Sequence, residues 1–188
     1  MVKYNIKCYI AIIAILAVGF FIIYVALFKL PIIESVSYSI TTLSVFAFLF
    51  ISFAWKWKVF RGWLVPFPDL SGKWKGYLES SYDMPGASKK IPIELSIRQT
   101  FMHIQIKLST KESKSNSIAA AFNIDDDRNI KQICYTYRNE PKAKLQERSP
   151  IHYGTVILDI DANEKMSGRY WTGRKTIGDI SVSKCGKK

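Results

Sequence analysis

The chain has 188 residues, of which 48% are hydrophobic, and a formal net charge of +12 at pH 7. This length allows a single domain, or one domain with an appendage. The three cysteines, Cys8, Cys134 and Cys185, form no close pair, which excludes a disulfide framework and a C-x-x-C metal site and fits a reducing compartment.

Two uncharged apolar runs occupy the N-terminal third of the chain, Cys8 to Phe28 and Ser35 to Trp55, with 21 residues each. About 20 apolar residues in a helix span the hydrocarbon core of a bilayer. The connection between them contains Pro31, which favours a turn. We therefore expect transmembrane helices at about residues 8–29 and 35–55, within an N-terminal part of residues 1–56. A cleaved signal peptide and a pair of buried helices in a soluble protein fit less well.

Basic and aromatic residues flank these runs. Because basic residues next to membrane ends stay in the cytoplasm, we expect both chain termini inside and the short connection outside. The basic residues behind this expectation are Lys3, Lys7, Lys56, Lys58 and Arg61. We place Trp55, Trp57 and Trp63 in the headgroup layer. The Ser and Thr residues of the second run fit either an ordinary membrane helix or one that packs against copies of itself.

After a basic, aromatic and proline-containing linker at residues 57–69, the period of the sequence changes to two. Pro66 and Pro68 keep the linker extended. Alternating apolar and polar residues then predict eight strands, separated by turn sequences such as DDDRN and DANEK. The predicted strands are 72–80, 91–99, 101–110, 113–122, 129–139, 153–161, 165–172 and 176–183.

Eight short strands within residues 70–188 favour a small antiparallel β-barrel, because closure removes the exposed edges of a sheet. A two-sheet sandwich is the alternative. Such a barrel has room for a packed interior or one small ligand. Trp74, Met102, Leu108, Val156 and Leu158 are expected to fill much of it. The fold class is therefore mainly β with a membrane anchor.

The residues of the predicted barrel contain no pattern typical of an enzyme. His103 and His152 lie in no metal-ligand spacing, and the acidic run at residues 125–127 lacks the Gly and Glu of a calcium loop. A glycine-rich phosphate loop and a nucleophile elbow are also missing from the sequence. We expect neither catalysis, nor a metal site, nor a cofactor.

Binding of an anionic partner is better supported. Residues 70–188 carry 21 basic and 13 acidic residues, a net charge of +8, although part of this charge also suits an anionic membrane surface. Two predicted strands combine aromatic and guanidinium groups, in CYTYRNEP and GRYWTGRKTIG. Aromatic rings stack on bases and arginines pair with phosphates, so the combination suits a small nucleotide. Core packing and cross-strand pairs would explain the aromatic residues equally well.

The layout as a whole resembles a known family. Two N-terminal membrane helices, PDLSGKWKGYLESS at the first strand, YTYRNEP, and HYGTVILDIDANEKMSGRYWTGRKTIGDISV are similar to the SMODS-associated two-transmembrane, β-strand-rich effectors of bacterial CBASS anti-phage systems. The positions that carry the resemblance are Gly72, Trp74, Gly76, Tyr135, Tyr137, Asn139, Pro141, Gly154, Gly168, Tyr170, Thr172, Arg174 and Gly178.

The resemblance implies an inner-membrane protein whose cytoplasmic barrel senses a cyclic oligonucleotide, most simply a cyclic dinucleotide. It implies that the ligand drives homo-oligomerisation of the membrane segments, disruption of the membrane among its lipids, and death of the infected cell. DNA and RNA polymers are not expected as partners.

Chemistry and motif together nominate candidate ligand residues in three roles. The stacking candidates are Tyr77, Tyr135, Tyr137 and Trp171. The phosphate candidates are Arg98, Arg138 and Arg174. The candidates for base edges or ribose are Ser115, Ser117, Asn139 and Thr172. Strand alternation sends Tyr137 and Arg138 to opposite faces, so these residues cannot all share one pocket.

Two other functions remain open at this stage. SGKWKG resembles the Gly-x-Trp opening of lipocalin-type barrels, which would suit a membrane-tethered carrier of an apolar ligand. Alternatively, the barrel is a constitutive membrane scaffold that docks a protein partner.

Overall fold

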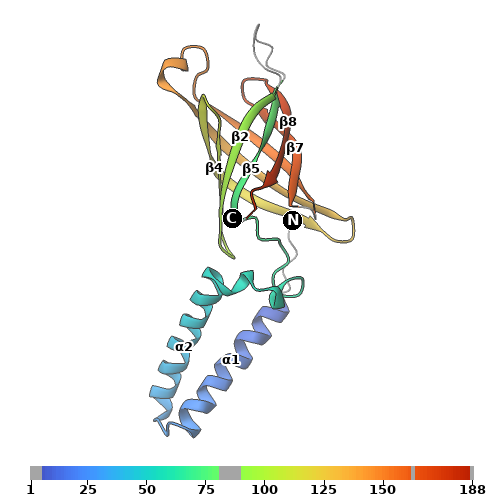
Figure 1. Ribbon diagram of the computed structural model, residues 1–188. Coiled ribbons are helices and arrows are strands. Elements are labelled where there is room, and N and C mark those ends of the chain that lie inside the picture. Colours follow the sequence, from blue (N-terminus) through green and yellow to red (C-terminus); the bar gives the residue numbers. More distant parts are fainter. Residues whose placement is uncertain (1–5, 81–89, 162–163, 187–188) are drawn as a thin grey trace. The chain divides into compact units, whose positions relative to one another are not determined.

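The computed structural model describes residues 6–80, 90–161 and 164–186 (Figure 1). Lys3, which contributes to the predicted orientation, lies outside the described residues. Contacts divide the described residues into a helical unit, residues 6–68 and 100–102, and a barrel unit, residues 69–80, 90–99, 103–161 and 164–186. The two units are described separately.

The helical unit contains α1 (Ile6–Ala26) and α2 (Ile32–Ser52), which are each 21 residues long and apolar enough to cross a membrane. Both begin and end two or three residues earlier than the predicted ranges. The turn between them has a positive φ of 52° at Lys29, and Pro31 is the residue immediately before α2. The helices pack through the Phe20 and Phe46 rings, 5.4 Å apart, and through a 2.7 Å hydrogen bond between the hydroxyls of Tyr24 and Thr42.

Two 3₁₀ turns, η1 (Ala54–Lys56) and η2 (Lys58–Phe60), follow α2. The three tryptophans predicted to lie in the headgroup layer differ in exposure. Trp57 and Trp63 are exposed, whereas Trp55 is buried against Phe67. Leu64 and Val65 are buried as well. The segment expected to be a plain extended linker therefore packs its apolar side chains within the helical unit.

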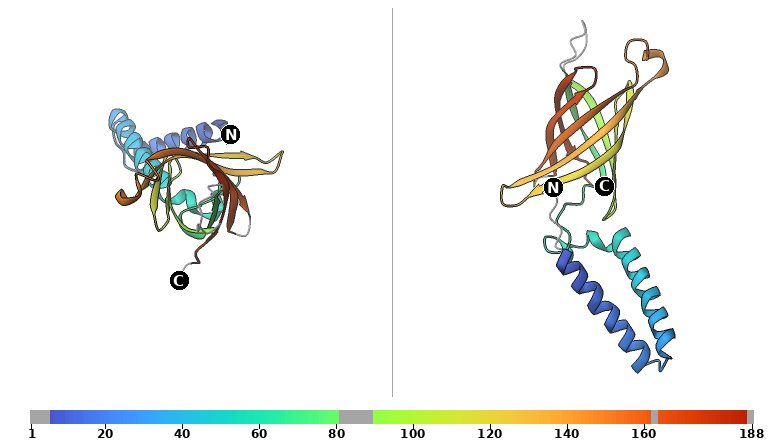
Figure 2. Two further views of the ribbon diagram at one scale, coloured as in Figure 1. Left: turned by 90° about the horizontal axis from the view of Figure 1, so that it is seen from above. Right: turned by 180° about the vertical axis from the view of Figure 1, so that it is seen from behind.

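The barrel unit consists of eight antiparallel strands that pair in chain order and close through β1 and β8 (Figures 1 and 2). Closure confirms the predicted barrel and excludes the sandwich. The strands are β1 (Gly72–Ser80), β2 (Lys90–Gln99), β3 (Ile104–Ser109), β4 (Ser113–Asp125), β5 (Ile130–Pro141), β6 (His152–Asp161), β7 (Lys165–Thr172) and β8 (Ile177–Lys184). One further 3₁₀ turn, η3 (Ala143–Leu145), lies between β5 and β6.

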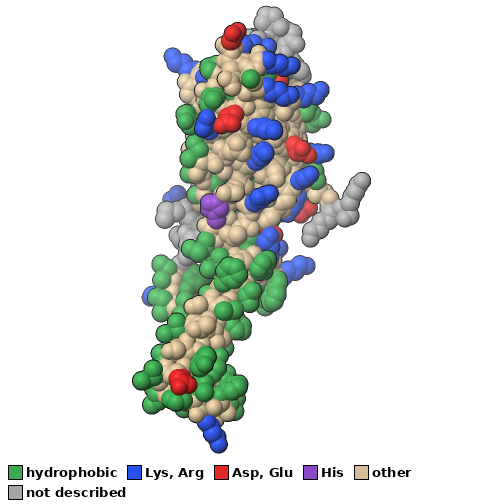
Figure 3. Space-filling model, turned by 90° about the vertical axis from the view of Figure 1, so that its left-hand side faces the viewer, with side chains coloured by type: hydrophobic (Ala, Val, Ile, Leu, Met, Phe, Trp, Pro, Cys, Tyr) green, Lys and Arg blue, Asp and Glu red, His purple; other side chains and the backbone are tan. Residues whose placement is uncertain are grey.

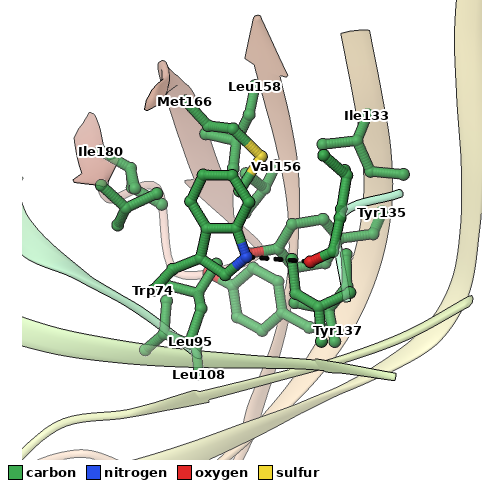
Figure 4. Packing of buried hydrophobic residues seen from close by; sticks show 14 of the residues in the cluster. Trp74, Leu95, Leu108, Ile133, Tyr135, Tyr137, Val156, Leu158, Met166 and Ile180 are labelled. Carbon is green, nitrogen blue, oxygen red and sulfur yellow. Dashed lines mark hydrogen bonds between the residues drawn. The ribbon is translucent and has the colours of Figure 1, made fainter. Parts of the chain in front are cut away.

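Alternation along the strands turns most of the apolar residues inward, and they fill the barrel around Trp74 (Figure 4). The indole of Trp74 donates a 2.9 Å hydrogen bond to the carbonyl oxygen of Leu70, so its polar group is satisfied inside the core. Leu95, Leu158 and Met166 are among the side chains with no exposed surface. Met102, predicted to join this core, lies before β3 and is 76% exposed, so that prediction was wrong.

Three strand glycines allow neighbouring backbones to approach closely. A Cβ atom at Gly76, Gly168 or Gly178 would lie 1.9 to 2.0 Å from a carbonyl oxygen of the adjacent strand. Glycine inside a strand marks such close approaches and bends. These three positions, which belong to the family resemblance, therefore have a structural reason to be glycine.

Candidate functional site

One end of the barrel holds a cavity of about 1430 Å³. The β3–β4, β5–β6 and β7–β8 connections lie at this end, as do the last residues of β1 and the first residues of β2. Trp74, Leu95 and Met166 of the packed core lie away from the cavity, whereas Leu108 and Val156 of the same core line it. The cavity therefore opens at one end of the barrel and has an apolar floor.

Two tyrosines from β5 form part of this floor. Tyr135 is 3% exposed, and its hydroxyl has no hydrogen-bond partner among the described residues. The ring of Tyr137 lies 6.2 Å from that of Tyr135 and covers Gly154, where a Cβ atom would lie 2.5 Å from the Tyr137 hydroxyl oxygen. The glycine thus makes room for the ring.

Burial raises the pKa of Tyr135 well above its ordinary value of 10.0, and the neighbouring Tyr137 adds to the effect. Burial also raises the pKa of Tyr137, with a smaller contribution from Tyr170. For Tyr170, burial and the nearby Asp179 carboxylate raise the pKa, while a hydrogen bond with Ser80 opposes them. All three hydroxyls consequently remain protonated at neutral pH and can donate a hydrogen bond to a ligand.

Polar side chains line the cavity above the tyrosines. The Ser115 hydroxyl donates a 2.8 Å hydrogen bond to Oδ1 of Asn139, its register partner on β5, and both residues are buried. Since Oδ1 has this donor, the Nδ2 amide group of Asn139 is the part that can offer hydrogen bonds to a ligand. On the opposite wall, the hydroxyls of Thr172 and Thr176 lie 2.7 Å apart.

Basic side chains surround the mouth and are held by neighbouring groups. Nη1 of Arg174 donates a 2.7 Å hydrogen bond to the Ser149 hydroxyl. Nη2 of Arg148 lies 3.1 Å from the Glu112 carboxylate. Lys90, Lys111 and His152 also line the cavity. The mouth therefore combines several basic side chains with the carboxylates of Glu79, Glu112 and Asp179, which an anionic ligand would have to replace as partners.

Seven of the eleven candidate residues predicted from the sequence lie at this cavity. They are Ser115, Tyr135, Tyr137, Asn139, Trp171, Thr172 and Arg174. Trp171 is at the rim, where strand alternation turns it toward the outer surface and leaves it 43% exposed.

The other four candidates lie elsewhere. Tyr77, Arg98 and Arg138 are on the outer surface. Arg98 and Arg138 alternate with buried residues, Tyr77 is 55% exposed, and Arg138 pairs with Glu140 at 3.3 Å. The Ser117 hydroxyl accepts a 2.9 Å hydrogen bond from the Ile106 amide, next to the bulge at residues 117–119. Ser117 thus stabilises the junction of β3 and β4.

The candidate list missed Arg148, His152 and Tyr170, which also line the cavity. Tyr170 alternates with Trp171 and faces inward, so the period of the strand would have favoured it as a cavity residue. Arg148 lies on the β5–β6 connection, for which the sequence offers no periodic pattern. In the described ranges, no group of three or more His, Cys, Asp and Glu residues is arranged to hold a metal ion.

Comparison with known proteins assigns this barrel to a receptor family. The family described as "Cap15, cyclic dinucleotide receptor domain" matches residues 65–184. A curated relative from Staphylococcus schleiferi, named CD-NTase-associated protein 15, is 37% identical over 152 residues, which cover 81% of this chain and 80% of the relative.

Proteins with the same name from two other bacteria are also similar. The protein from Escherichia albertii is 28% identical over 97% of this chain and 94% of its own length. The protein from Yersinia aleksiciae is 32% identical over 62% of this chain and 55% of its own length. With the matched region spanning the barrel, this chain belongs to the Cap15 family of CBASS effectors, and its barrel is the cyclic dinucleotide receptor domain of that family.

Proposed function

We propose that the end cavity of the barrel binds one cyclic dinucleotide and that the bound ligand drives self-association of the protein in the bacterial inner membrane. The assembled helices would disrupt the membrane and kill the infected cell. The observation that carries the proposal is a large cavity that combines buried tyrosine hydroxyls, a buried amide and arginine side chains at its mouth.

The size of the cavity suits a ligand larger than a mononucleotide. Ordinary small-molecule sites have volumes of roughly 300–1,000 Å³, whereas this cavity has about 1430 Å³. Tyr137 and Tyr170 offer aromatic faces for bases, and the Asn139 amide offers donors for a base edge. Arg148 and Arg174 at the mouth suit the two phosphates, because guanidinium groups pair with phosphate oxygens in a bidentate way.

The contacts of the mouth arginines supply a way to couple binding to a change in the protein. Arg148 and Arg174 connect the β5–β6 connection to Glu112 on one side and, through Ser149, to the β7–β8 turn on the other. A phosphate that takes over either arginine would release one of these connections. The ligand then binds one arrangement of the mouth more tightly than the other. A switch between two conformations requires such a difference in affinity.

Coupling between ligand and assembly follows from linkage. A ligand promotes self-association only if it binds the assembled state more tightly, and about 1.4 kcal/mol of coupling changes the equilibrium tenfold. Confinement to a membrane raises the effective concentration of the copies. The apolar lengths of α1 and α2 support insertion, and the flanking lysines support a cytoplasmic barrel.

The test is calorimetric titration of the full-length protein in detergent with cyclic di- and trinucleotides, with fatty acids as controls. We expect saturable binding of a cyclic dinucleotide, weakened at least tenfold by Arg174→Ala and by Asn139→Ala. Arg138→Ala is the matched control, because it removes an arginine from the outer surface. Binding of a fatty acid alone would instead favour the carrier, and binding of neither class would favour the scaffold.

A further inference from the structure

The outer surface of β1–β4 carries a cluster of basic side chains, here called the basic wall. It consists of Lys73, Lys75, Arg98, Lys107 and Lys114. Figure 3 shows a side of the barrel over which Lys and Arg side chains gather. Glu94 lies among them and pairs with Lys75 at 3.7 Å, while the other four make no ion pair with any residue that the structure describes.

The register of the strands spaces these charges regularly. Lys73 and Lys107 both lie opposite Ser96, from the two sides of β2, so they are two strands apart. This separation is about 10 Å, and the residue between them is uncharged. Two basic walls from two copies would therefore repel each other rather than form a symmetric contact.

The outer surface of β6–β8, here called the acidic wall, has three carboxylates and two basic residues and is therefore slightly acidic. It carries Asp159, Asp161 and Asp179. The two basic residues of this wall each lie beside a carboxylate. Arg169 is 3.8 Å from Asp179, and Lys165 is the register partner of Asp161. In the closed order of eight strands, β7 is four strands from β3, so the middle strands of the two walls lie on opposite sides of the barrel, while β1 and β8 pair where the walls adjoin.

The acidic wall also presents exposed apolar side chains. Trp171 and Ile177 are register partners on β7 and β8, and Tyr153 on β6 is 60% exposed. Exposed apolar groups within a polar surface are typical of protein interfaces. Lysine and arginine side chains can cover such aromatic rings with their aliphatic stems and interact with the ring faces.

We propose that the basic wall of one copy docks on the acidic wall of a second copy. This interface deepens the proposed function, on which it rests, by naming the surfaces of self-association. Because the two walls differ, each added copy leaves one wall of each kind uncovered, and the assembly can continue to grow. A contact between two acidic walls would close at a dimer and leave the basic wall without a partner.

The test uses full-length protein reconstituted in membranes, with the cyclic dinucleotide that binds the native chain, and measures assembly by chemical crosslinking. Lys73→Glu/Lys107→Glu reverses the basic wall, and Asp159→Lys/Asp161→Lys reverses the acidic wall. We expect each double variant to bind the ligand as the native protein does and to need at least tenfold more protein to assemble. Lys131→Glu/Lys144→Glu makes the same change in net charge as the basic-wall variant but lies outside both walls, and it is expected to assemble normally.

Mixing the two reversed proteins in equal amounts gives the decisive measurement. The reversed basic wall of one variant then meets the reversed acidic wall of the other, and the two native walls meet as well. We expect the mixture to regain native assembly with the two variants alternating. Normal assembly of the basic-wall variant would overturn the proposal, and so would a mixture that stays unassembled, which would point to a different partner such as anionic lipid. If the native protein binds no cyclic nucleotide, the proposed function fails first.

Discussion

At the scale of single residues, the Tyr135 hydroxyl is the feature that most clearly points to a ligand. It is buried in the cavity floor and has no hydrogen-bond partner in the described part of the chain. A buried polar group without a partner costs roughly 1–3 kcal/mol. A protein keeps such a group more readily where a ligand provides the missing partner.

Replacement of this hydroxyl should therefore separate stability from binding. We expect Tyr135→Phe to leave the free energy of unfolding unchanged or to raise it by about 1 kcal/mol, because the unsatisfied group is gone. The same change should weaken cyclic dinucleotide binding about tenfold, the loss of roughly one hydrogen bond. Thermal unfolding and calorimetry measure the two effects, with Tyr153→Phe on the outer surface as the control. A less stable variant with native affinity would contradict this role.

Alkaline pH should destabilise the barrel through the same tyrosines. Burial raises the pKa of Tyr135, Tyr137 and Tyr170 above the ordinary value of 10.0. Because the pKa of each tyrosine is higher in the folded state, the unfolded chain loses these protons first as the pH rises. The contribution of the protonated tyrosines to the free energy of unfolding is therefore complete below pH 10 and is lost as the pH rises through their folded-state pKa values. Unfolding temperatures measured between about pH 8 and pH 11 should fall more steeply for the native protein than for Tyr135→Phe. Equal slopes would argue against a buried, neutral Tyr135.

At the scale of elements, the close approach of β6 and β7 depends on Gly168. A Cβ atom there would lie 2.0 Å from the Ile157 carbonyl oxygen and 2.9 Å from the Leu158 Cα atom, both of which belong to the backbone. Backbone atoms cannot rotate away as a flexible side chain can. The pairing of the two strands must shift if Gly168 gains a side chain.

We accordingly expect Gly168→Ala to lower the free energy of unfolding by roughly 3 kcal/mol, at the upper end of the usual cost of overpacking. Gly173→Ala is the matched control, because its Cβ atom would meet nothing closer than the Tyr153 carbonyl oxygen at 3.9 Å. Denaturant unfolding of both full-length variants in detergent checks the difference. A Gly168→Ala protein as stable as the control would show that the two strands can separate without cost.

At the scale of the whole molecule, the proposed function links a ligand site in the barrel to assembly in the membrane. Linkage is reciprocal, so assembly must tighten ligand binding by the same factor by which the ligand favours assembly. Protein held as single copies in nanodiscs should therefore bind the cyclic dinucleotide more weakly than protein at high density in vesicles. Affinities measured in both preparations test this, and equal affinities would show that binding and assembly are not coupled.

The sequence alone was sufficient to locate the two long helices and the eight strands and to indicate the family. Uncharged runs of 21 residues predicted α1 and α2, and the period of two predicted the positions of all eight strands, with β1 and β7 correct at both ends. These features depend on the order of neighbouring residues, which the sequence contains. The receptor family was likewise predicted from local motifs, and the comparisons confirm it.

Only the tertiary structure decided which candidate residues lie together. Closure of β1 on β8 and the stagger of the strands determine which inward positions reach the open end, so Asn139 and Thr172 meet at the cavity although they lie on different strands. Tyr77 and Arg138 have suitable chemistry but face outward, and Ser117 supports a strand junction. The β5–β6 connection brought Arg148 to the mouth without any periodic signal. Composition and period describe each strand by itself, whereas a binding site depends on the register between strands, which long-range packing determines.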